Sequence, residues 1–382
     1  MIVFLFFLLF LLVLVELVKG LSANGTPPLL QKYSWQMDLA YFMWSNIRMM
    51  RIVLIAAIIS VLLGEFSWGS LGLTLALGSF WAGIYYVFNH YWVGRVKFQP
   101  IGQMVFKGES ENEIAADIQV MGVDLGGEQK AYPVPMLFYH HQISDTVGDQ
   151  PVWATYCGLC RSGRIYDRQV EGQALTFTLV GAITFNAVFK DHQTGTWWRQ
   201  ETGEAAKGPM AGKILSDVWV EQMSLKNWLD KHPDSLILQH DPTFAKKYGF
   251  LAKLMAYEAS LPGWHRQDSP PLIIGVEVEG AARAYDFEQL KKRYLVNDTL
   301  NGTALLVLSD GVGSGFVYER EGHEFELTED GVKDTATGST WDLFGRCVKG
   351  KLKGQALTQV PSRQQFLRAW IDFHGHTDFY EF

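Results

Sequence analysis

The chain has 382 residues, enough for one large domain or two of ordinary size, and it can bury a substantial core. Its hydrophobic content of 48% and aromatic content of 14% are high for a soluble protein, and both are explained if part of the chain lies in lipid. Charged residues make up only 19%, the net charge is −7, and no basic run contains interleaved aromatic residues. This composition argues against nucleic-acid binding.

The first predicted element is a membrane anchor at residues 1–20. The segment from Met1 to Val18 is apolar apart from Glu16, and about 18 to 20 such residues span a bilayer. No positive charge precedes the apolar run and no clear small-residue cleavage site follows it. We therefore expect a retained anchor rather than a cleaved signal peptide.

A second apolar region predicts a transmembrane helical hairpin at residues 49–93, with its turn between Gly64 and Ser70. The second arm ends in an aromatic belt like those at membrane–water interfaces, formed by Tyr85, Tyr86, Tyr91 and Trp92. Lysines and arginines gather between the first and second spans, which places that loop in the cytoplasm. With three spans the large domain joins it there, whereas cleavage of the first span would leave the domain outside.

An internal repeat organises the rest of the chain. Three segments of the chain recur later in the same order. The segment from Gly122-Val-Asp to Ala131-Tyr132 matches the one from Gly275-Val-Glu to Ala284-Tyr285, and Ser162-Gly-Arg-Ile-Tyr-Asp-Arg168 matches Ser314-Gly-Phe-Val-Tyr-Glu-Arg320. The third pair is Trp228-Leu-Asp-Lys-His232 and Trp370-Ile-Asp-Phe-His374. The first repeat is predicted at residues 98–243 and the second at 272–382, with a linker at 244–271. That much ordered similarity indicates duplication of one folding unit.

Each repeat is expected to consist of short strands followed by one helix near its end. Alternating apolar residues and glycine-containing turns predict the strands. The helices are predicted at Ser224 to Lys231, with Ser224 as N-cap, and at Ser362 to Phe373. The fold class is therefore mainly β (α+β): an internally duplicated, β-rich domain with one helix per repeat, preceded by transmembrane helices.

Residues that occur in one repeat only are the best candidates for a site, because architectural residues should recur in both. By this criterion His232 and His374, at matching helix ends, are interpreted as C-terminal caps. When the two repeats are aligned, Cys157 corresponds to Ser309, Cys160 to Val312 and His192 to Thr335, and His140 and His141 also lack histidine counterparts. The remaining cysteine, Cys347, is expected to be a small buried apolar residue.

Three interpretations of the Cys-x-x-Cys remain open. As one knuckle on a strand–turn–strand, Cys157 and Cys160 could supply half of a tetrahedral soft-metal site, for zinc or copper, completed by His140, His141 or His192. The pair could instead perform thiol redox chemistry. A thioredoxin fold is not expected, because a strand rather than a helix follows Cys160. In the third interpretation the cysteines only stabilise a turn.

Other motifs give weaker indications. Arg161 and the polar residues around Trp197-Trp198, which are Asp191, Arg199 and Glu201, are candidates for substrate binding, although residues of this kind beside a turn are often solvated loop positions. The Gly208 to Lys213 segment has one residue too few for a phosphate-binding P-loop.

Several of these segments resemble the domain-of-unknown-function 3179 family over roughly residues 115 to 380. The likeness lies in an ordered set of motifs: Tyr156-Cys-Gly-Leu-Cys160-Arg-Ser162, Thr194-Gly-Thr-Trp197-Trp198, Gly203-Glu-Ala, Gly208-Pro209, Gly212, Trp228 and His232-Pro233-Asp234. The family typically has Tyr-Cys-Pro-x-Cys-Gly-Ser, so Gly158 replaces the proline and Arg161 the second glycine. The resemblance implies a prokaryotic protein that is exported or membrane-associated, here in the cytoplasmic membrane, and carries no known activity.

Together these observations predict a membrane-anchored protein, with membrane lipid as its partner through the N-terminal helices. Its activity is unknown, and a single metal or thiol-redox centre is expected in the first repeat. If the protein is an enzyme, its substrate is expected to bind in the groove between the repeats. The alternative is a non-catalytic binding or assembly module in which the cysteines are structural.

Overall fold

The structure is a computed structural model that describes residues 2–382 except 24–32, 65, 159 and 261–270. It divides into two compact units, which are described separately. The first contains Met1–Gln99 together with Leu175–Ile214, and the second contains Pro100–Ala174 together with Leu215–Phe382. Part of the first predicted repeat therefore belongs to the same compact unit as the N-terminal helices.

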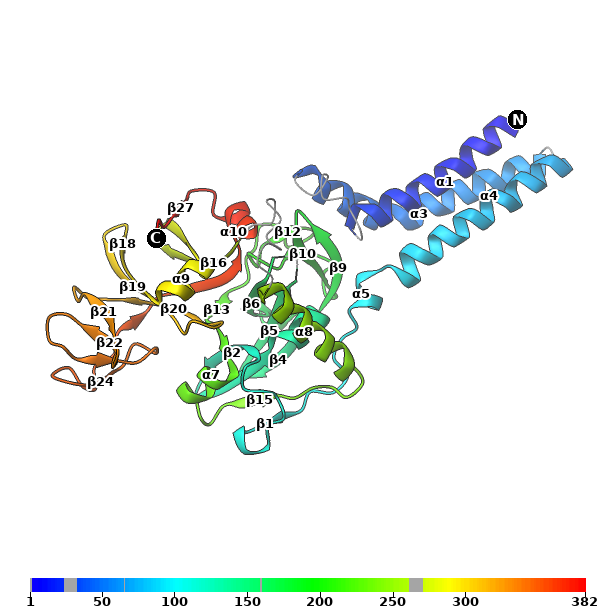
Figure 1. The fold of residues 1–382 in the computed structure, drawn as a ribbon. Helices are drawn as coiled ribbons and strands as arrows, with labels where there is room; N and C mark the ends of the chain where they lie inside the picture. Colours follow the sequence, from blue (N-terminus) through cyan, green and yellow to red (C-terminus); the bar gives the residue numbers. More distant parts are fainter. Residues whose placement is uncertain (1, 24–32, 65, 159, 261–270) are drawn as a thin grey trace. The chain divides into compact units, whose positions relative to one another are not determined.

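Three apolar helices dominate the first unit and lie side by side (Figure 1). Each is long and apolar enough to cross a membrane, which indicates membrane association. They are α1 (Ile2–Ala23), α3 (Trp35–Gly64) and α4 (Trp68–Tyr86), and α4 continues into a π-helical turn, η1 (Val87–Tyr91), before the short α5 (Gly94–Lys97). The helix α3 begins well before the predicted start of the hairpin at residue 49.

Leucines at helical spacing hold the bundle together. Leu5, Leu8, Leu9 and Leu12 of α1 are buried against Ile58 of α3, because residues three and four apart lie on one face of a helix. At the start of α4, Ser67 and Ser70 form a reciprocal capping box. These apolar and capping contacts specify a three-helix bundle.

A four-stranded antiparallel sheet completes the first unit. Its order is β12-β11-β10-β9, and the strands are β9 (Phe177–Ile183), β10 (Asn186–Asp191), β11 (Trp197–Arg199) and β12 (Ala205–Lys207). Trp197 packs edge-on against Tyr41 of α3, with ring centroids 5.3 Å apart. The first half of α3 is thus fixed on a protein sheet, while its second half is the apolar part of the bundle.

The second unit holds the rest of the first repeat. One sheet has the order β1-β15-β3-β2-β14 and another the order β13-β6-β5-β4. The strands and helices are β1 (Phe106–Lys107), η2 (Glu109–Glu111), β2 (Gln119–Leu125), β3 (Glu128–Pro133), α6 (Val134–His140), β4 (Gln142–Val147), β5 (Gln150–Cys157), β6 (Ser162–Asp167), β7 (Gln169–Val170), β8 (Gln173–Ala174), β13 (Asp217–Val218), β14 (Glu221–Ser224), α7 (Leu225–Lys231), β15 (Leu236–Leu238) and the linker helix α8 (Ala245–Ser260).

The second repeat follows the same plan within this unit. Its sheets have the orders β26-β16-β17-β27, β18-β19-β20-β25 and β21-β22-β23-β24. The elements are β16 (Leu272–Val278), β17 (Ala281–Asp286), α9 (Phe287–Arg293), β18 (Leu295–Leu300), β19 (Thr303–Ser309), β20 (Gly315–Glu319), β21 (Phe325–Thr328), β22 (Gly331–Asp334), β23 (Thr340–Trp341), β24 (Cys347–Lys349), β25 (Thr358–Gln359), β26 (Ser362–Phe366), α10 (Leu367–Phe373) and β27 (Thr377–Phe379).

Matching contacts maintain the two copies. A Cβ on Gly122 would lie 2.2 Å from the ring of Trp228, and one on Gly275 would lie 2.5 Å from the ring of Trp370. Only glycine fits at these points of close approach. Four residues after each tryptophan lies a histidine that is the C-cap residue of its helix. The backbone N–H of His232 donates to the carbonyl of Trp228 at 2.7 Å, and that of His374 donates to the carbonyl of Trp370 at 2.8 Å. This supports the architectural interpretation of the two histidines.

The mainly β, α+β fold class is confirmed, but the helices differ from the prediction in two ways. Each repeat contains a second helix, α6 directly after β3 and α9 directly after β17. The apolar run of α6 cannot be told from a longer strand by periodicity, and α9 has only two apolar residues, Phe287 and Leu290, too few to show a helical period. In addition, α10 begins at Leu367 rather than at Ser362, because Ser362–Phe366 pairs with β16 as a strand.

Candidate functional site

The Cys-x-x-Cys forms the turn between β5 and β6. Cys157 is the last residue of β5 and lies opposite Ser162, the first residue of β6. The two sulfur atoms of Cys157 and Cys160 are 3.0 Å apart, no disulfide joins them, and their exposed fractions are 2% and 1%. The fold thus places two reduced thiols in contact inside the protein.

Arg161 and Tyr156 lie beside the thiols. The guanidinium of Arg161 is 5.9 Å from the ring centroid of Phe138 and the same distance from that of Phe366. Burial raises the pKa of Tyr156, and the nearby sulfur groups raise it further, whereas the charge of Arg161 and its hydrogen bond lower it. The turn therefore brings one cation and one phenol to the cysteine pair.

Two positions in this turn are constrained by the backbone and by packing. Arg161 has a φ of +56°, a left-handed conformation that favours glycine. A Cβ on Gly158 would lie 2.7 Å from the ring of Phe138. Contact with Phe138 therefore favours glycine at position 158, whereas the backbone conformation of Arg161 costs about 1 kcal/mol.

Strand register corrects the alignment of the cysteines with the second repeat. Tyr156 pairs with Gly163 in the first repeat, as Ser309 pairs with Gly315 in the second. The counterpart of Cys157 is therefore Asp310, not Ser309. The sequence comparison was wrong by one residue because the turn of the first repeat is one residue longer, a difference that residue similarity at a turn does not reveal.

Asp310 shows what this position in the fold favours. Its Oδ1 atom accepts backbone N–H groups of Val312, Gly313 and Ser314 at 2.8, 2.9 and 2.9 Å. Burial raises the pKa of this carboxyl group, but the hydrogen bonds outweigh burial and leave it below its usual value. In the second repeat the turn thus encloses a negative charge at the position where the first repeat has Cys157.

The proposed histidine ligands make other contacts. The Nε2 atom of His140 lies 2.6 Å from the hydroxyl of Tyr248. Burial lowers the pKa of His141 to about 4, although hydrogen bonds to the backbone of Tyr139 and Phe138 oppose the shift. His192, in the first unit, contacts the hydroxyls of Thr176 and Thr178 at 3.2 and 2.5 Å.

The positions of these three histidines decide whether they could complete a metal site with the cysteines. Across the part of the chain that the structure describes, no group of three or more His, Cys, Asp or Glu side chains could hold a metal ion. Two thiolates on one tetrahedral zinc, with Zn–S bonds of about 2.3 Å, would be about 3.8 Å apart. The sulfur separation of 3.0 Å is shorter than that. That separation lies between the zinc spacing and a disulfide bond of about 2.05 Å, so the ground against a zinc site is the lack of a third ligand among the described residues.

The remaining candidates lie in the first unit and hold its turns. Asp191 accepts the indole N–H of Trp198 at 2.8 Å, and Asp334 accepts that of Trp341 at 3.3 Å in the second repeat. Arg199 donates to the hydroxyl of Thr184 at 3.1 Å and pairs with Glu204 at 3.5 Å. Glu201 is fully buried, and its backbone N–H donates to Asn186 at 3.2 Å. A role for Arg161, Asp191, Arg199 or Glu201 in substrate binding stays a prediction.

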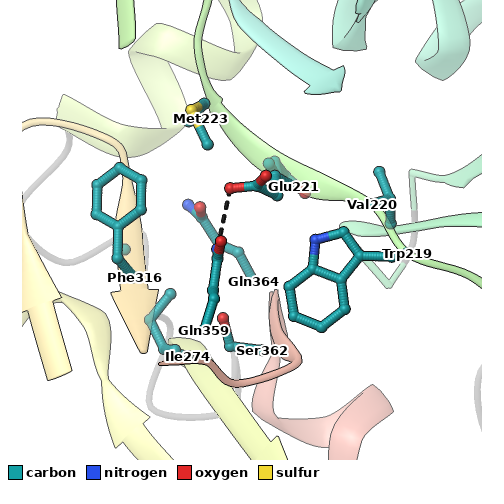
Figure 2. Close-up of a pocket in the computed structure, with 11 residues that line it drawn as sticks. Trp219, Val220, Glu221, Met223, Ile274, Phe316, Gln359, Ser362 and Gln364 are labelled. Carbon is teal, nitrogen blue, oxygen red and sulfur yellow. Dashed lines mark hydrogen bonds between the residues drawn. The ribbon is translucent and has the colours of Figure 1, made fainter. Parts of the chain in front are cut away.

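A cleft between the two repeats was expected, but its residues were not identified from the sequence. Figure 2 shows one half of it, where Trp219 and Glu221 face Phe316 and Gln359. Glu221 accepts hydrogen bonds from Gln359 at 2.9 Å and Lys231 at 2.7 Å. A second half adjoins it, lined by Met121, Gly163, Val220, Gln222, Ser362, Arg363, Gln364 and Gln365.

The two halves of the cleft are related by the duplication. Gln222 and Gln364 occupy equivalent positions on β14 and β26, and both line both halves. The other groups differ in sign: Glu221 is negative in one half, whereas Arg363, paired with Asp217 at 2.7 Å, is positive at the equivalent position in the other. The recurrence of a glutamine at equivalent positions is the sequence signal that could have identified the centre of this cleft.

Comparison with known proteins bears on this duplicated domain as a whole. A family model described as a protein of unknown function, DUF3179, matches residues 100–377. The chain belongs to the DUF3179 family. No curated protein and no solved structure matches it. The DUF3179 match extends over nearly all of both predicted repeats.

Proposed function

We propose that this DUF3179 protein carries a thiol redox centre in which Cys157 and Cys160 interconvert between a dithiol and a disulfide. The observation that carries the proposal is the sulfur separation of 3.0 Å between two cysteines that are not joined by a disulfide. A disulfide bond of about 2.05 Å needs the sulfurs to approach by about 1 Å. Thiol exchange needs only this pair, whereas a tetrahedral zinc site needs further ligands, and the described residues contain no group of three or more.

The chemistry is thiol–disulfide exchange with a disulfide in a second molecule. One thiolate attacks that disulfide, forms a mixed disulfide and releases the first thiol of the substrate. The second cysteine, after losing its proton, attacks the mixed disulfide, closes the Cys157–Cys160 bond and releases the second thiol. Two electrons pass to the substrate disulfide, and the two protons lost by the cysteines balance the two thiols formed.

Cys157 is proposed as the attacking thiol. Its counterpart Asp310 is a carboxylate stabilised by three backbone N–H groups of its turn, so this position in the fold favours negative charge. Arg161, four residues on, adds a guanidinium to the same turn. Both features favour a thiolate over a thiol, against the opposing effect of burying Cys157.

Redox titration of the full-length protein in detergent tests the proposal. Differential alkylation and mass spectrometry should find one disulfide, between Cys157 and Cys160, that opens and closes reversibly, while Cys347 stays a thiol. A Cys347→Ser variant should titrate like the wild type, and a Cys157→Ser/Cys160→Ser variant should not titrate. Failure of the pair to oxidise, or stoichiometric metal lost only in the double variant, would refute the redox proposal. An inert pair whose replacement changes nothing would favour a binding module instead.

The charges at the two ends of the bundle favour a cytoplasmic location for the repeats. At one end of the bundle, α1 ends at Ala23, α3 begins at Trp35 and η1 ends at Tyr91. Arg95 and Lys97 lie in α5, which follows η1 in the chain. At the other end, the described residues around Gly64 and Trp68 include no lysine or arginine. Because cytoplasmic loops carry the excess of positive charge, we place the first end in the cytoplasm. Disulfides there are usually transient or catalytic, in keeping with a reversible pair.

A topology reporter tests this orientation. Alkaline phosphatase, which is active only outside the cytoplasm, fused after Phe382 should be inactive, and a fluorescent reporter that folds in the cytoplasm should be bright. As a control, the same phosphatase inserted after Gly64 should be active. The reverse pattern would place the repeats outside and contradict the charge argument.

A further inference from the structure

A charged cluster lies inside the three-helix bundle. Glu16 of α1 is fully buried and accepts two hydrogen bonds from Arg51 of α3, at 2.9 and 2.7 Å. The side-chain amide of Asn89 donates to the same carboxylate at 2.6 Å. Helix α1, helix α3 and the turn η1, which continues α4, thus each contribute one residue to this charged cluster.

Two more cations converge on Asn89. Lys19 donates to its side-chain oxygen at 2.8 Å and Arg95 to its backbone carbonyl at 3.4 Å. Arg51 is the cation bonded to Glu16, and Lys19 and Arg95 join the cluster through Asn89; with three cations and one carboxylate, the cluster has an excess of two positive charges. Asn89 itself lies in the π-helical turn Val87–Tyr91, and such turns often occur at functional sites.

The cluster lies towards one end of the candidate membrane spans. Glu16 is about 21 Å from Ile2 along α1, at 1.5 Å per residue, which is within the roughly 30 Å of a hydrocarbon core. Aromatic rings accompany the cations, as at membrane interfaces: Arg51 lies 4.7 Å from the ring of Tyr85, and Lys19 lies 4.2 Å from that of Trp44. An excess of positive charge at this depth is costly unless an anion compensates it.

We propose that this cluster binds the phosphate of an anionic phospholipid headgroup. Arg95 is exposed and Arg51 retains an exposed side-chain fraction of 16%, so both can reach a phosphate at the bundle surface. Lys19 is buried behind them and adds charge without direct access. A lipid is favoured over free phosphate because apolar helices flank the cluster and would contact the acyl chains.

Binding of defined lipids to the full-length protein tests the proposal. In native mass spectrometry from detergent, phosphatidylglycerol should bind more tightly than phosphatidylcholine and should raise the melting temperature. Arg95→Gln should weaken phosphatidylglycerol binding about fivefold, the effect of one cation near a membrane surface. Because Arg95 is exposed, this variant should fold, and Lys353→Gln, an equal loss of charge at an exposed site of the second repeat, should bind like the wild type.

Three outcomes would overturn the proposal. Equal affinity for the two lipids would remove the role of headgroup charge. Equal affinity of Arg95→Gln and Lys353→Gln would remove the role of this cluster. Stabilisation by inorganic phosphate as strong as that by phosphatidylglycerol would show that the ligand is the free anion and not a lipid.

Discussion

Replacing Trp228 by alanine is expected to lower the free energy of unfolding of the repeat domain by about 3–5 kcal/mol, the usual cost of deleting a buried aromatic side chain. Trp228 is completely buried, and its indole N–H donates to the hydroxyl of Ser235 at 2.7 Å. Gly122 has no side chain because the ring occupies that space. The variant would leave both a cavity and an unpaired hydroxyl.

Urea unfolding of the full-length protein in detergent measures the effect. Trp219→Ala is the matched control, because it removes the same atoms from a side chain that is 39% exposed. We expect the control to change the unfolding free energy by less than about 1 kcal/mol. Equal midpoints for the two variants would show that the close contact of Gly122 and Trp228 does not stabilise the repeat. Trp370→Ala should reproduce the large effect in the second repeat.

The Cys160→Ser variant is expected to stop the exchange reaction at its intermediate. With the second thiol absent, a mixed disulfide on Cys157 cannot be resolved. Treatment with a small aromatic disulfide should therefore leave one reagent group on Cys157, detected by peptide mass spectrometry. The wild type treated in the same way should release both reagent thiols and retain no adduct.

The reciprocal variant identifies the attacking thiol. Cys157→Ser keeps Cys160 but loses the thiol in the position of Asp310, so it should react at least tenfold more slowly. Both variants keep the size of the side chain and one thiol of the pair, so a difference in rate reports thiolate character rather than loss of packing. Faster labelling of Cys160 than of Cys157 would contradict the assignment while leaving the redox proposal itself standing.

The sequence predicted the duplicated plan because both copies need the same residues for the same contacts. Gly122 and Gly275 recur because each meets a tryptophan ring, and Asp145 and Asp298 recur because each accepts the hydroxyl of Tyr132 or Tyr285, at 2.8 and 2.6 Å. The apolar helices were predictable for a similar reason, since their composition and length suffice. The second helix of each repeat was not, because seven residues are too few to show a helical period, whether apolar as in α6 or mostly polar as in α9.

For the candidate site, the sequence by itself determined that two thiols lie in one turn of one repeat and have no counterparts in the other. Only the tertiary structure decided what surrounds them. Strand pairing set Cys157 in the position of Asp310, and the fold directed His140 to Tyr248 rather than to a shared metal site. Neighbours in sequence are fixed by the chain, whereas register and side-chain direction depend on contacts between residues far apart, which spacing along the chain does not specify.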